Sequence, residues 1–249
     1  MWRGGATNML EEKLSKLNYW ISKSDNIVFF GGAGVSTESG IPDFRSEDGV
    51  YSSSYDYPPE TIISHSFFMK KTDEFYRFYK DKMVYQDAEP NISHIKLADM
   101  ERSGKLKGII TQNIDGLHQK AGSTKVYELH GSILRNNCMK CNKFYSLSYI
   151  MKREITPKCN CGGTIKPDVV LYEESLDDKV LHKSIDLIKN ADILLIGGTS
   201  LSVYPAAGLV NYYKGDKMVL INKSVTPYDK SVDLLIKAGL GEVFSAIIA

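Results

Sequence analysis

The sequence predicts an α/β protein built on a doubly wound, Rossmann-like parallel sheet, with a smaller lobe formed by two insertions. The first observation is that short apolar runs recur without alternating polar residues, as expected for strands that helices cover on both faces. The second is a helical pattern at 175–190, which would fill a crossover between two such strands. The third is that two regions break this rhythm. The predicted strands lie in 26–30, 106–113, 125–131, 191–201 and 217–223; the large lobe comprises about 7–45, 96–131 and 172–249, and the small lobe 46–95 and 132–171.

The composition is that of a globular protein with balanced charge. The 249 residues include 31 Lys plus Arg and 30 Asp plus Glu, for a formal net charge of +1, and 43% are hydrophobic. This balance disfavours binding to nucleic acid or anionic membrane through charge alone. No stretch approaches the roughly 20 apolar residues of a spanning helix, and the start lacks the apolar core of a secretory signal. We therefore expect a cytoplasmic monomer that contacts neither membrane nor nucleic acid directly; a second methionine, Met9, leaves open whether residues 1–8 are native.

All four cysteines fall in the insertion 132–171, in the order C-x2-C, seventeen intervening residues, then C-x-C-G-G. Disulfide-stapled proteins are usually small and secreted, so metal binding is favoured over disulfides. Two close pairs at this separation are typical of a zinc ribbon, although the usual second pair is C-x2-C. Gly162 and Gly163 would provide the tight turn that the shorter spacer at Asn160 requires. Four thiolates leave no ligand position open, so we expect one structural zinc on Cys138, Cys141, Cys159 and Cys161, with four reduced thiols as the alternative.

A glycine-rich loop follows the first predicted strand. Gly31, Gly32 and Gly34 would let backbone N–H groups approach a phosphate at the start of a helix. The third glycine of the G-x-G-x-x-G pattern is replaced by Thr37, and no acidic residue ends a second strand some twenty residues on. The loop therefore indicates a nucleotide site but not an ordinary dehydrogenase, and a tight turn without a ligand remains open.

Polar residues follow the other predicted strands. Gln112, Asn113 and Asp115 lie at the end of the run 106–113, where buried polar groups need hydrogen-bond partners. His130 stands at another strand end before a glycine, a suitable place for a general base. Each of these also fits a helix cap, a turn or a structural histidine. Further candidates at strand ends or in the Ile-Pro turn are Thr199, Ser200, Asn222, Asp43, Phe44 and Arg45.

Taken in order, the motifs GAGVSTESGIPDFRS, TQNIDGLH, ELHG, the cysteine quartet, KPDVVLYEE, GGTSL and LINK resemble the sirtuins, the NAD-dependent protein-lysine deacylases. The resemblance runs from about Asp25 to about Phe244 and is closest to the bacterial type. It implies that acetyl groups are removed from lysine side chains of proteins or peptides. NAD would be the co-substrate, zinc would be structural, and the products would be nicotinamide, O-acetyl-ADP-ribose and free lysine.

The resemblance also implies which residues form the site, and the family's loop needs no third glycine, which accounts for Thr37. His130 would be the general base, with Asn113 and Asp115 as further catalytic residues. Val169, Val170 and Leu171 would pair with the substrate peptide as an added strand. The NAD-binding residues would be Gly32, Ala33, Gly34, Thr37, Asp43, Phe44, Arg45, Gln112, Asn113, Ile114, Asp115, His130, Gly198, Thr199, Ser200, Asn222 and Gly239.

Acyl preference and competing activities are the remaining expectations. Sirtuins that remove succinyl or malonyl groups carry Y-x-x-R in the helical insertion, and here Tyr79 stands at the Arg position after Tyr76. Deacetylation is therefore favoured, unless Arg77 swings into the pocket. The alternatives are mono-ADP-ribosyl transfer or removal of another acyl group on the same scaffold, a zinc-ribbon interaction or nucleic-acid module, and a hydride-transferring dehydrogenase.

Overall fold

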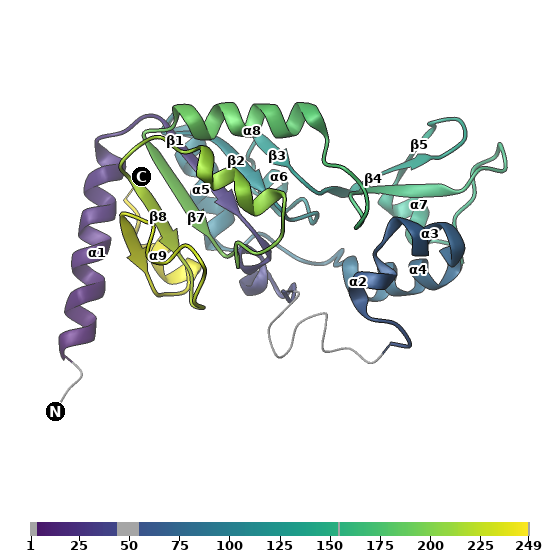
Figure 1. Cartoon of the computed structure of the whole chain (residues 1–249), viewed down its shortest axis with the longest axis horizontal. Coiled ribbons are helices and arrows are strands. Elements are labelled where there is room, and N and C mark those ends of the chain that lie inside the picture. The colour runs from purple at the N-terminus through teal and green to yellow at the C-terminus, as the bar shows by residue number, and fades with distance from the viewer. Residues whose placement is uncertain (1–3, 44–54, 154, 249) are drawn as a thin grey trace.

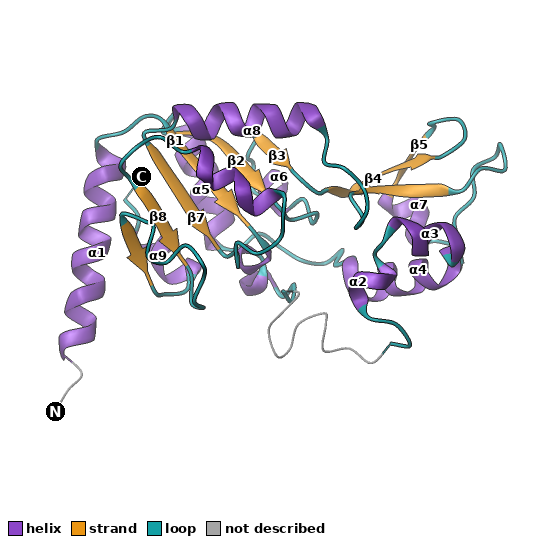
Figure 2. Cartoon of the chain, in the orientation of Figure 1, coloured by secondary structure: helices purple, strands orange, loops and turns teal. Residues whose placement is uncertain are grey.

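The computed structural model describes residues 4–43, 55–153 and 155–248. The molecule is elongated, with a large lobe around a six-stranded sheet at one end and a small lobe around a three-stranded sheet at the other (Figure 1). Helices cover the strands of the large sheet on both faces (Figure 2). The doubly wound parallel sheet with a smaller inserted lobe, as predicted from the sequence, is confirmed.

The large sheet is wholly parallel, and its strand order is β3-β2-β1-β7-β8-β9. The chain builds outward from β1 on one side and from β7 on the other, which places the switch point between these two strands. Ligands of such sheets bind beyond the carboxyl ends of the strands at that point. There Gly31 pairs in register with Gly197. The strands are β1 (Ile27–Gly31), β2 (Leu106–Thr111), β3 (Val126–Glu128), β7 (Ile193–Gly197), β8 (Met218–Ile221) and β9 (Leu234–Ile236).

The two faces of the large sheet have separate cores, because successive side chains of a strand point to opposite faces. Ile27 and Phe29 pack with α1, α5 and α9, and Val28 and Phe30 pack with α8 and η5. The helix α1 at the start of the chain buries Leu17 and other residues against the sheet. The helices of this lobe are α1 (Gly4–Ser22), α5 (Ile92–Arg102), α6 (Leu117–Lys120), α8 (Asp178–Asn190), α9 (Leu240–Ala246) and the 3-10 helices η1 (Ala33–Val35), η2 (Thr37–Ser39) and η5 (Ala206–Tyr212).

Both insertions contribute to one core in the small lobe. Phe68, Phe75 and Tyr79 of the helical insertion pack with Cys138 and Ile165 of the cysteine-bearing insertion. The sheet is antiparallel in the order β5-β4-β6, so β6 lies at an edge. The elements are α2 (Pro59–Ile62), α3 (His65–Lys70), α4 (Thr72–Phe78), the π-helix η4 (Tyr79–Met83), β4 (Gly131–Cys138), β5 (Phe144–Ser146), α7 (Leu147–Met151) and β6 (Ile165–Val169).

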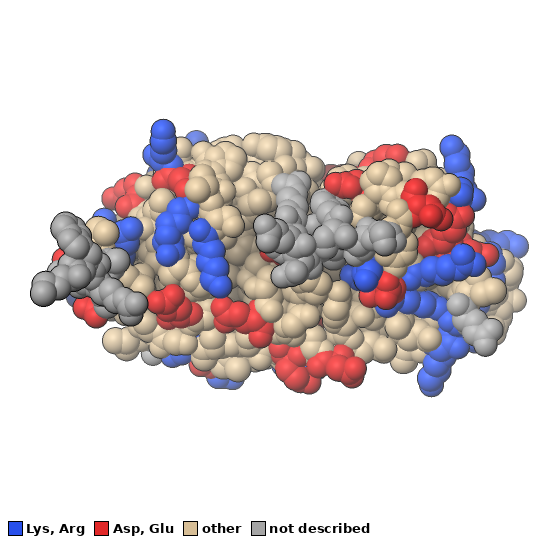
Figure 3. Space-filling view, turned by 90° about the horizontal axis from the view of Figure 1, so that it is seen from below, with Lys and Arg blue, Asp and Glu red and all other residues tan. Residues whose placement is uncertain are grey.

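The helix α5 packs against α9, β2 and α6 of the large lobe. This helix begins at Ile92, ahead of the large-lobe segment predicted from 96, and its Leu97 and Met100 lie in a core of the large sheet. The lobe boundaries as a whole stay a prediction. Within the described ranges, no helix combines the length and apolar character needed to cross a membrane. Acidic and basic side chains are interspersed on the face in Figure 3, with Lys and Arg densest at the small-lobe end.

Candidate active site

A cleft between the lobes brings together most residues that the sequence predicts for the site. Gly32, Thr37 and Gly239 are described but do not line it, and Phe44 and Arg45 lie outside the described residues. The predicted residues that line the cleft are Ala33, Gly34, Asp43, Gln112, Asn113, Ile114, Asp115, His130, Val169, Val170, Leu171, Gly198, Thr199, Ser200 and Asn222.

The glycine loop lies directly against the end of β7. The Gly34 amide donates to the Gly198 carbonyl oxygen at 2.8 Å. A Cβ on Gly34 would stand 2.8 Å from Gly198 Cα, so the two loops can approach this closely only because the side chain is absent. Thr37 stands where the third glycine of the motif would be. Its hydroxyl donates to the Gly34 carbonyl at 3.1 Å and so fixes the conformation of the loop. The result is a narrow cradle of backbone at the switch point of the sheet.

A polar network joins this loop to the end of β2. Asn113 Nδ2 donates to Ser36 Oγ at 3.0 Å, and Ser36 Oγ donates to Asp115 Oδ2 at 2.7 Å. Asp115 Oδ1 accepts from the amide of Leu117, the first residue of the short helix α6, at 2.9 Å, and this hydrogen bond fixes the carboxylate. Ser36 is buried and lines the cleft, but the sequence analysis did not single it out. Its place inside the glycine-loop motif was the signal that could have identified it.

His130 is held so that one ring nitrogen can act as a base. Its Nδ1 lies 2.9 Å from the Gln112 carbonyl oxygen, and because a carbonyl only accepts, Nδ1 carries the proton and Nε2 has the free lone pair. Burial lowers the pKa of His130 below its ordinary value, while the hydrogen bond to Gln112 partly offsets this. The imidazole is therefore neutral at neutral pH, as a proton acceptor must be. The second bond of Gln112, from Nε2 to Thr199 Oγ1 at 3.0 Å, ties the same segment to β7.

The predicted peptide segment starts beside His130. The Val170 amide donates to the His130 carbonyl oxygen at 3.0 Å, and Gly131 pairs with Val169. Gly131 has φ +71, and a Cβ there would stand 1.9 Å from the Asp168 carbonyl oxygen. Only glycine permits this approach, which places β6 and the residues after it next to the histidine. β6 is an edge strand of its sheet, which is the position where another extended chain can add as a strand.

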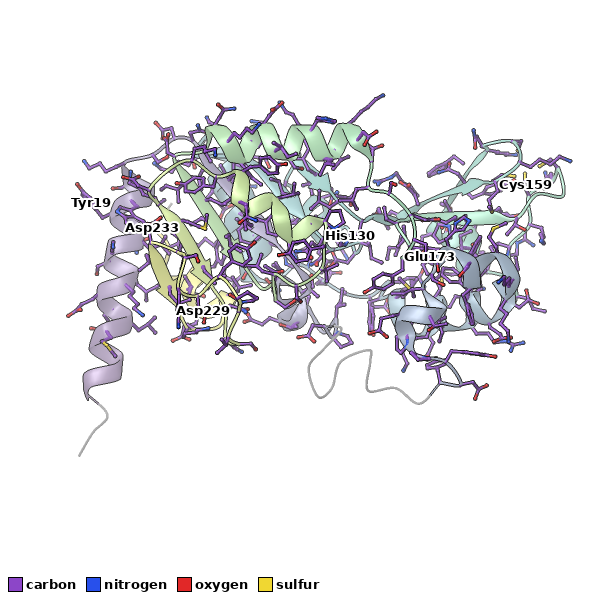
Figure 4. The ribbon with its side chains drawn as sticks, viewed as in Figure 1. Tyr19, His130, Cys159, Glu173, Asp229 and Asp233 are labelled. Atoms are coloured by element: carbon purple, nitrogen blue, oxygen red, sulfur yellow. The ribbon has the colours of Figure 1, made fainter. Side chains whose placement is uncertain are left out.

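The four cysteines meet at the far end of the small lobe, away from His130 (Figure 4). All four sulfur atoms lie within 4.8 Å of one another, at 3.5 Å for Cys138–Cys161 and Cys141–Cys161 and 3.6 Å for Cys141–Cys159. Four sulfurs around a tetrahedral zinc with bonds of about 2.3 Å would be about 3.8 Å apart. These cysteines form no disulfide. The cluster therefore fits one zinc with a closed, structural coordination sphere.

The turn around this cluster also explains the unusual C-x-C pair. Gly162 has φ +80, and its amide donates to the Cys159 carbonyl at 2.9 Å. A Cβ on Gly163 would stand 2.6 Å from Cys138 Sγ. Both glycines are thus needed to bring Cys159 and Cys161, the pair with the shorter spacer, close to Cys138 and Cys141. Tyr145 donates its hydroxyl to Cys159 Sγ at 3.0 Å, a hydrogen bond that supports a thiolate ligand from outside the site.

A model of the Sir2 family matches residues 32–205, which is most of the chain. The chain belongs to the Sir2 family. Two relatives in this family carry the name NAD-dependent protein deacetylase. The Sir2 protein of Clostridium acetobutylicum is 56% identical over 244 residues, which cover 96% of this chain and 100% of the relative. That of Cutibacterium acnes is 50% identical over 234 residues, which cover 93% and 96%.

Solved Sir2 structures match the same fold. A Sir2 variant with a deacetylated p53 peptide and 3′-O-acetyl ADP ribose has a TM-score of 0.86 at 35% identity and covers 94% of this chain and 96% of that one. A Sir2 protein bound to a propionylated peptide has a TM-score of 0.82 at 35% identity, with coverage of 94% and 96%. The resemblance to sirtuins that the motifs suggested is therefore confirmed.

The Sir2 cleft also contains residues that the sequence did not mark individually as site residues, although Ile41 and Pro42 lie inside the glycine-loop motif and Tyr172 inside KPDVVLYEE. They are apolar or aromatic side chains from separate segments of both lobes, and their convergence depends on how the insertions pack. Beside Ser36, these residues are Ile41, Pro42, Ile63, Met83, Tyr85, Tyr172, Leu176, Val203, Tyr204 and Pro205.

Proposed function

We propose that this chain removes acetyl groups from lysine side chains of proteins in the cleft between its lobes, with His130 as the general base. The chain is an NAD-dependent protein deacetylase, with NAD as its co-substrate and one structural zinc. The position of His130 is the observation on which we assign the reaction to this cleft. The ring of His130 is hydrogen-bonded to Gln112, a predicted NAD-binding residue. The backbone carbonyl of His130 accepts from Val170, a predicted peptide-binding residue.

The chemistry divides between the co-substrate and the residues around it. NAD supplies a bond from ribose to a positively charged nicotinamide ring, and cleavage neutralises that ring and makes it a good leaving group. Asn113 and Asp115, joined through Ser36, hold the nicotinamide end. The carbonyl oxygen of the acetyl group would form a bond to the ribose carbon as the bond to nicotinamide breaks. His130 Nε2 would then take a proton from a neighbouring ribose hydroxyl, which attacks the carbon of the acetyl group, and addition of one water would release the lysine amine. The products are nicotinamide, O-acetyl-ADP-ribose and free lysine.

Apolar residues in the cleft keep water from the ribose and suit a neutral acyl group. Tyr79, at the position where the family's acidic-acyl enzymes carry Arg, is fully buried in the small-lobe core and does not line the cleft. We therefore propose that acetyl-lysine is turned over faster than succinyl-lysine, and better turnover of succinyl-lysine would contradict this. The apolar residues are Ile41, Ile63, Met83, Val169 and Leu171.

Mass spectrometry of an acetyl-lysine peptide, with and without NAD, tests the reaction. Loss of the acetyl group together with NAD-dependent O-acetyl-ADP-ribose is the expected result. A label from NAD that stays on protein while acetyl groups are retained would indicate ADP-ribosyl transfer, and a change in absorbance at the reduced-nicotinamide wavelength would indicate hydride transfer. Either result would contradict the proposed reaction.

His130→Ala tests the general base. We expect the rate to fall by about 100-fold to 10,000-fold, the usual contribution of such a group, with zinc content and unfolding temperature unchanged. In the parent enzyme the acid limb of kcat/KM should lie below the ordinary histidine pKa of about 6.5, because burial lowers the pKa of His130. Near-normal turnover by His130→Ala would refute the assignment.

We further propose that the chain acts as a monomer in the cytoplasm, without direct contact to membrane or nucleic acid. The reduced cysteine cluster suits a reducing compartment, and the net charge of +1 gives little general attraction to polyanions. Light scattering of the purified protein and fractionation of cells that express it test these points. A stable dimer, or recovery with the membrane fraction, would contradict them.

A further inference from the structure

Glu173 adopts a backbone conformation that is unfavourable for any residue with a side chain. Its φ is +75, and the Glu174 amide donates to the Leu171 carbonyl at 3.0 Å. This hydrogen bond and a positive φ at the third position define a type II turn, where glycine is the favoured residue. A glutamate kept at such a position is a reason to ask what its carboxylate contributes.

The carboxylate of Glu173 is held in place at the edge of the cleft. Its two oxygens accept from the Ser66 amide and the Ser66 hydroxyl, both at 2.9 Å, at the start of α3. Glu173 is exposed and lines the cleft, and it follows the predicted peptide segment Val169–Leu171 by two residues. Figure 4 shows it on the small-lobe side, with His130 on the side of the large sheet. The side chain is therefore oriented before any peptide arrives.

Its neighbour Glu174 differs in having cations of its own. Lys166 Nζ lies 3.0 Å from Glu174 Oε2, and His65 Nδ1 lies 2.8 Å from Glu174 Oε1. No ion pair within the described ranges includes Glu173, whose partner there is the neutral Ser66. The one Lys or Arg that lines the cleft within these ranges is Lys82, whose ammonium lies 3.3 Å from Asp81. The negative charge of Glu173 can therefore pair with a positively charged group that enters the cleft.

We propose that Glu173 determines substrate specificity by favouring acetylated lysines that have Lys or Arg close by in the sequence. This rests on the proposed deacetylation and on a peptide that runs along Val169–Leu171. Because Ser66 uses only one lone pair of each oxygen, a guanidinium can still bind both oxygens in the fork geometry of Arg and carboxylate. Arg is therefore favoured over Lys. The site is exposed, so the preference is modest and falls as salt rises.

The test is a set of acetyl-lysine peptides that differ at one flanking position, with Arg, Lys, Ala or Glu at each position in turn. For the parent enzyme we expect kcat/KM to be about twofold to fivefold higher for Arg than for Ala at one or two positions, the range for an exposed ion pair. The ratio should decrease at high salt and reverse for Glu. Ratios are taken within each enzyme, so that changes in its overall activity cancel.

Two variants of Glu173 and one control complete the test. Glu173→Gln keeps the size and an acceptor for Ser66, and Glu173→Gly removes the side chain and relieves the turn, so a variant that folds is available. Both should bring the Arg-to-Ala ratio close to one. Glu60→Gln removes an exposed carboxylate of the same lobe outside the cleft and should keep the parent ratio.

The outcomes separate this inference from the proposed function. Equal ratios in the parent enzyme and Glu173→Gln, with NAD-dependent turnover of the Ala peptide intact, overturn the role of Glu173 alone. A ratio that also falls in Glu60→Gln overturns it too, because the effect would then follow general charge. Failure to deacetylate any peptide overturns the proposed function itself.

Discussion

The two halves of the cleft are constructed in different ways. On the large lobe, backbone groups of the glycine loop touch the end of β7 at Gly198, and a short network through Ser36 fixes Asn113 and Asp115. On the small-lobe side of the cleft, side chains tie together segments far apart in sequence, as Glu173 does with Ser66. The first half is assembled mainly through close backbone contacts at Gly34 and Gly198. The second half has one such approach, at Gly131, and in addition depends on contacts between side chains and on the cysteine cluster behind it.

This difference implies that the two halves can be damaged separately. A change at the glycine loop should weaken NAD binding and leave peptide recognition in place, whereas a change in the small lobe should do the reverse. KM for NAD and KM for the peptide are therefore the two readouts that test the comparison. A variant that alters both equally would show that the halves act as one unit.

Loss of zinc should have the largest effect. Cys159→Ala removes a ligand that is buried in the small-lobe core, and structural zinc contributes about 10–16 kcal/mol in isolated zinc-finger peptides. We expect zinc to be lost, turnover to fall more than about 100-fold, and amide exchange to rise in the small lobe but not in β1 or β7. Metal analysis and hydrogen exchange measure this. Asn160→Ala, in the exposed spacer, is the control, and full activity of chelated, metal-free protein would contradict the prediction.

Gly34→Ala should disrupt the large-lobe half of the cleft, where the glycine loop lies. The new Cβ would stand 2.8 Å from Gly198 Cα and 2.9 Å from its carbonyl oxygen, and neither backbone can yield easily. We expect the affinity for NAD to fall by about 100-fold, about 2.7 kcal/mol, with zinc retained. Calorimetric titration with NAD measures this. Gly208→Ala is matched, because its Cβ would make only ordinary contacts from 3.5 Å, and an unchanged NAD affinity in Gly34→Ala would show that the close approach is not required.

A buried histidine pair behind the NAD half should make stability depend on pH. The rings of His94 and His118 are 4.8 Å apart and buried, and desolvation lowers the pKa of His94 to about 4 and that of His118 to about 3. Below pH 6.5 the unfolded chain binds protons at these residues and the native protein does not, so the free energy of unfolding falls as the pH drops from 6.5 toward 4. At pH 5 this amounts to about 2 kcal/mol for each histidine.

Urea unfolding between pH 4.5 and pH 8 measures this dependence. His118→Gln removes one titrating ring and should flatten the slope between pH 5 and pH 6.5. Activity measured at pH 7 serves as a control for the fold of the variant. A slope identical to that of the parent would show that another group binds the proton.

Sequence reasoning was strongest where a feature depends on residues close together in the chain. The buried strands, the glycine loop and the cysteine spacing are local patterns, and the structure has each of them where it was predicted. Contacts such as Ser66 with Glu173 join residues more than a hundred positions apart, and although Glu173 lies inside the KPDVVLYEE motif, no local pattern indicates this contact. The positive φ of Glu173 is equally invisible, because a turn of this kind is normally recognised by its glycine. The local backbone of the glycine loop was therefore predictable, and the contacts that join distant segments on the other side of the cleft were not.

Asn91 joins the start of α5 to the glycine-loop segment and should give the smallest effect. It caps α5 by accepting from the Ser93 amide at 2.9 Å, and its Nδ2 donates to the Val35 carbonyl at 2.7 Å and to Ser39 Oγ at 3.0 Å. Asn91→Asp keeps the cap, because Asp is as good at this position, but places a carboxylate oxygen against the Val35 carbonyl. We expect KM for NAD to rise about tenfold, as for a lost buried hydrogen bond and its unsatisfied partner. KM for the peptide should not change.

A second variant separates the cap from the loop contact. In Asn91→Ser the serine can also cap the helix. It does not reproduce the hydrogen bond from Asn91 to the Val35 carbonyl, and it places no negative charge against that carbonyl. Its KM for NAD should fall between those of the parent and Asn91→Asp, while all three proteins unfold at similar temperatures. If Asn91→Asp raised both KM values together, the glycine loop and the peptide segment would be coupled through α5. The separation of the two halves would then have to be abandoned, because a residue from the helical insertion would govern both.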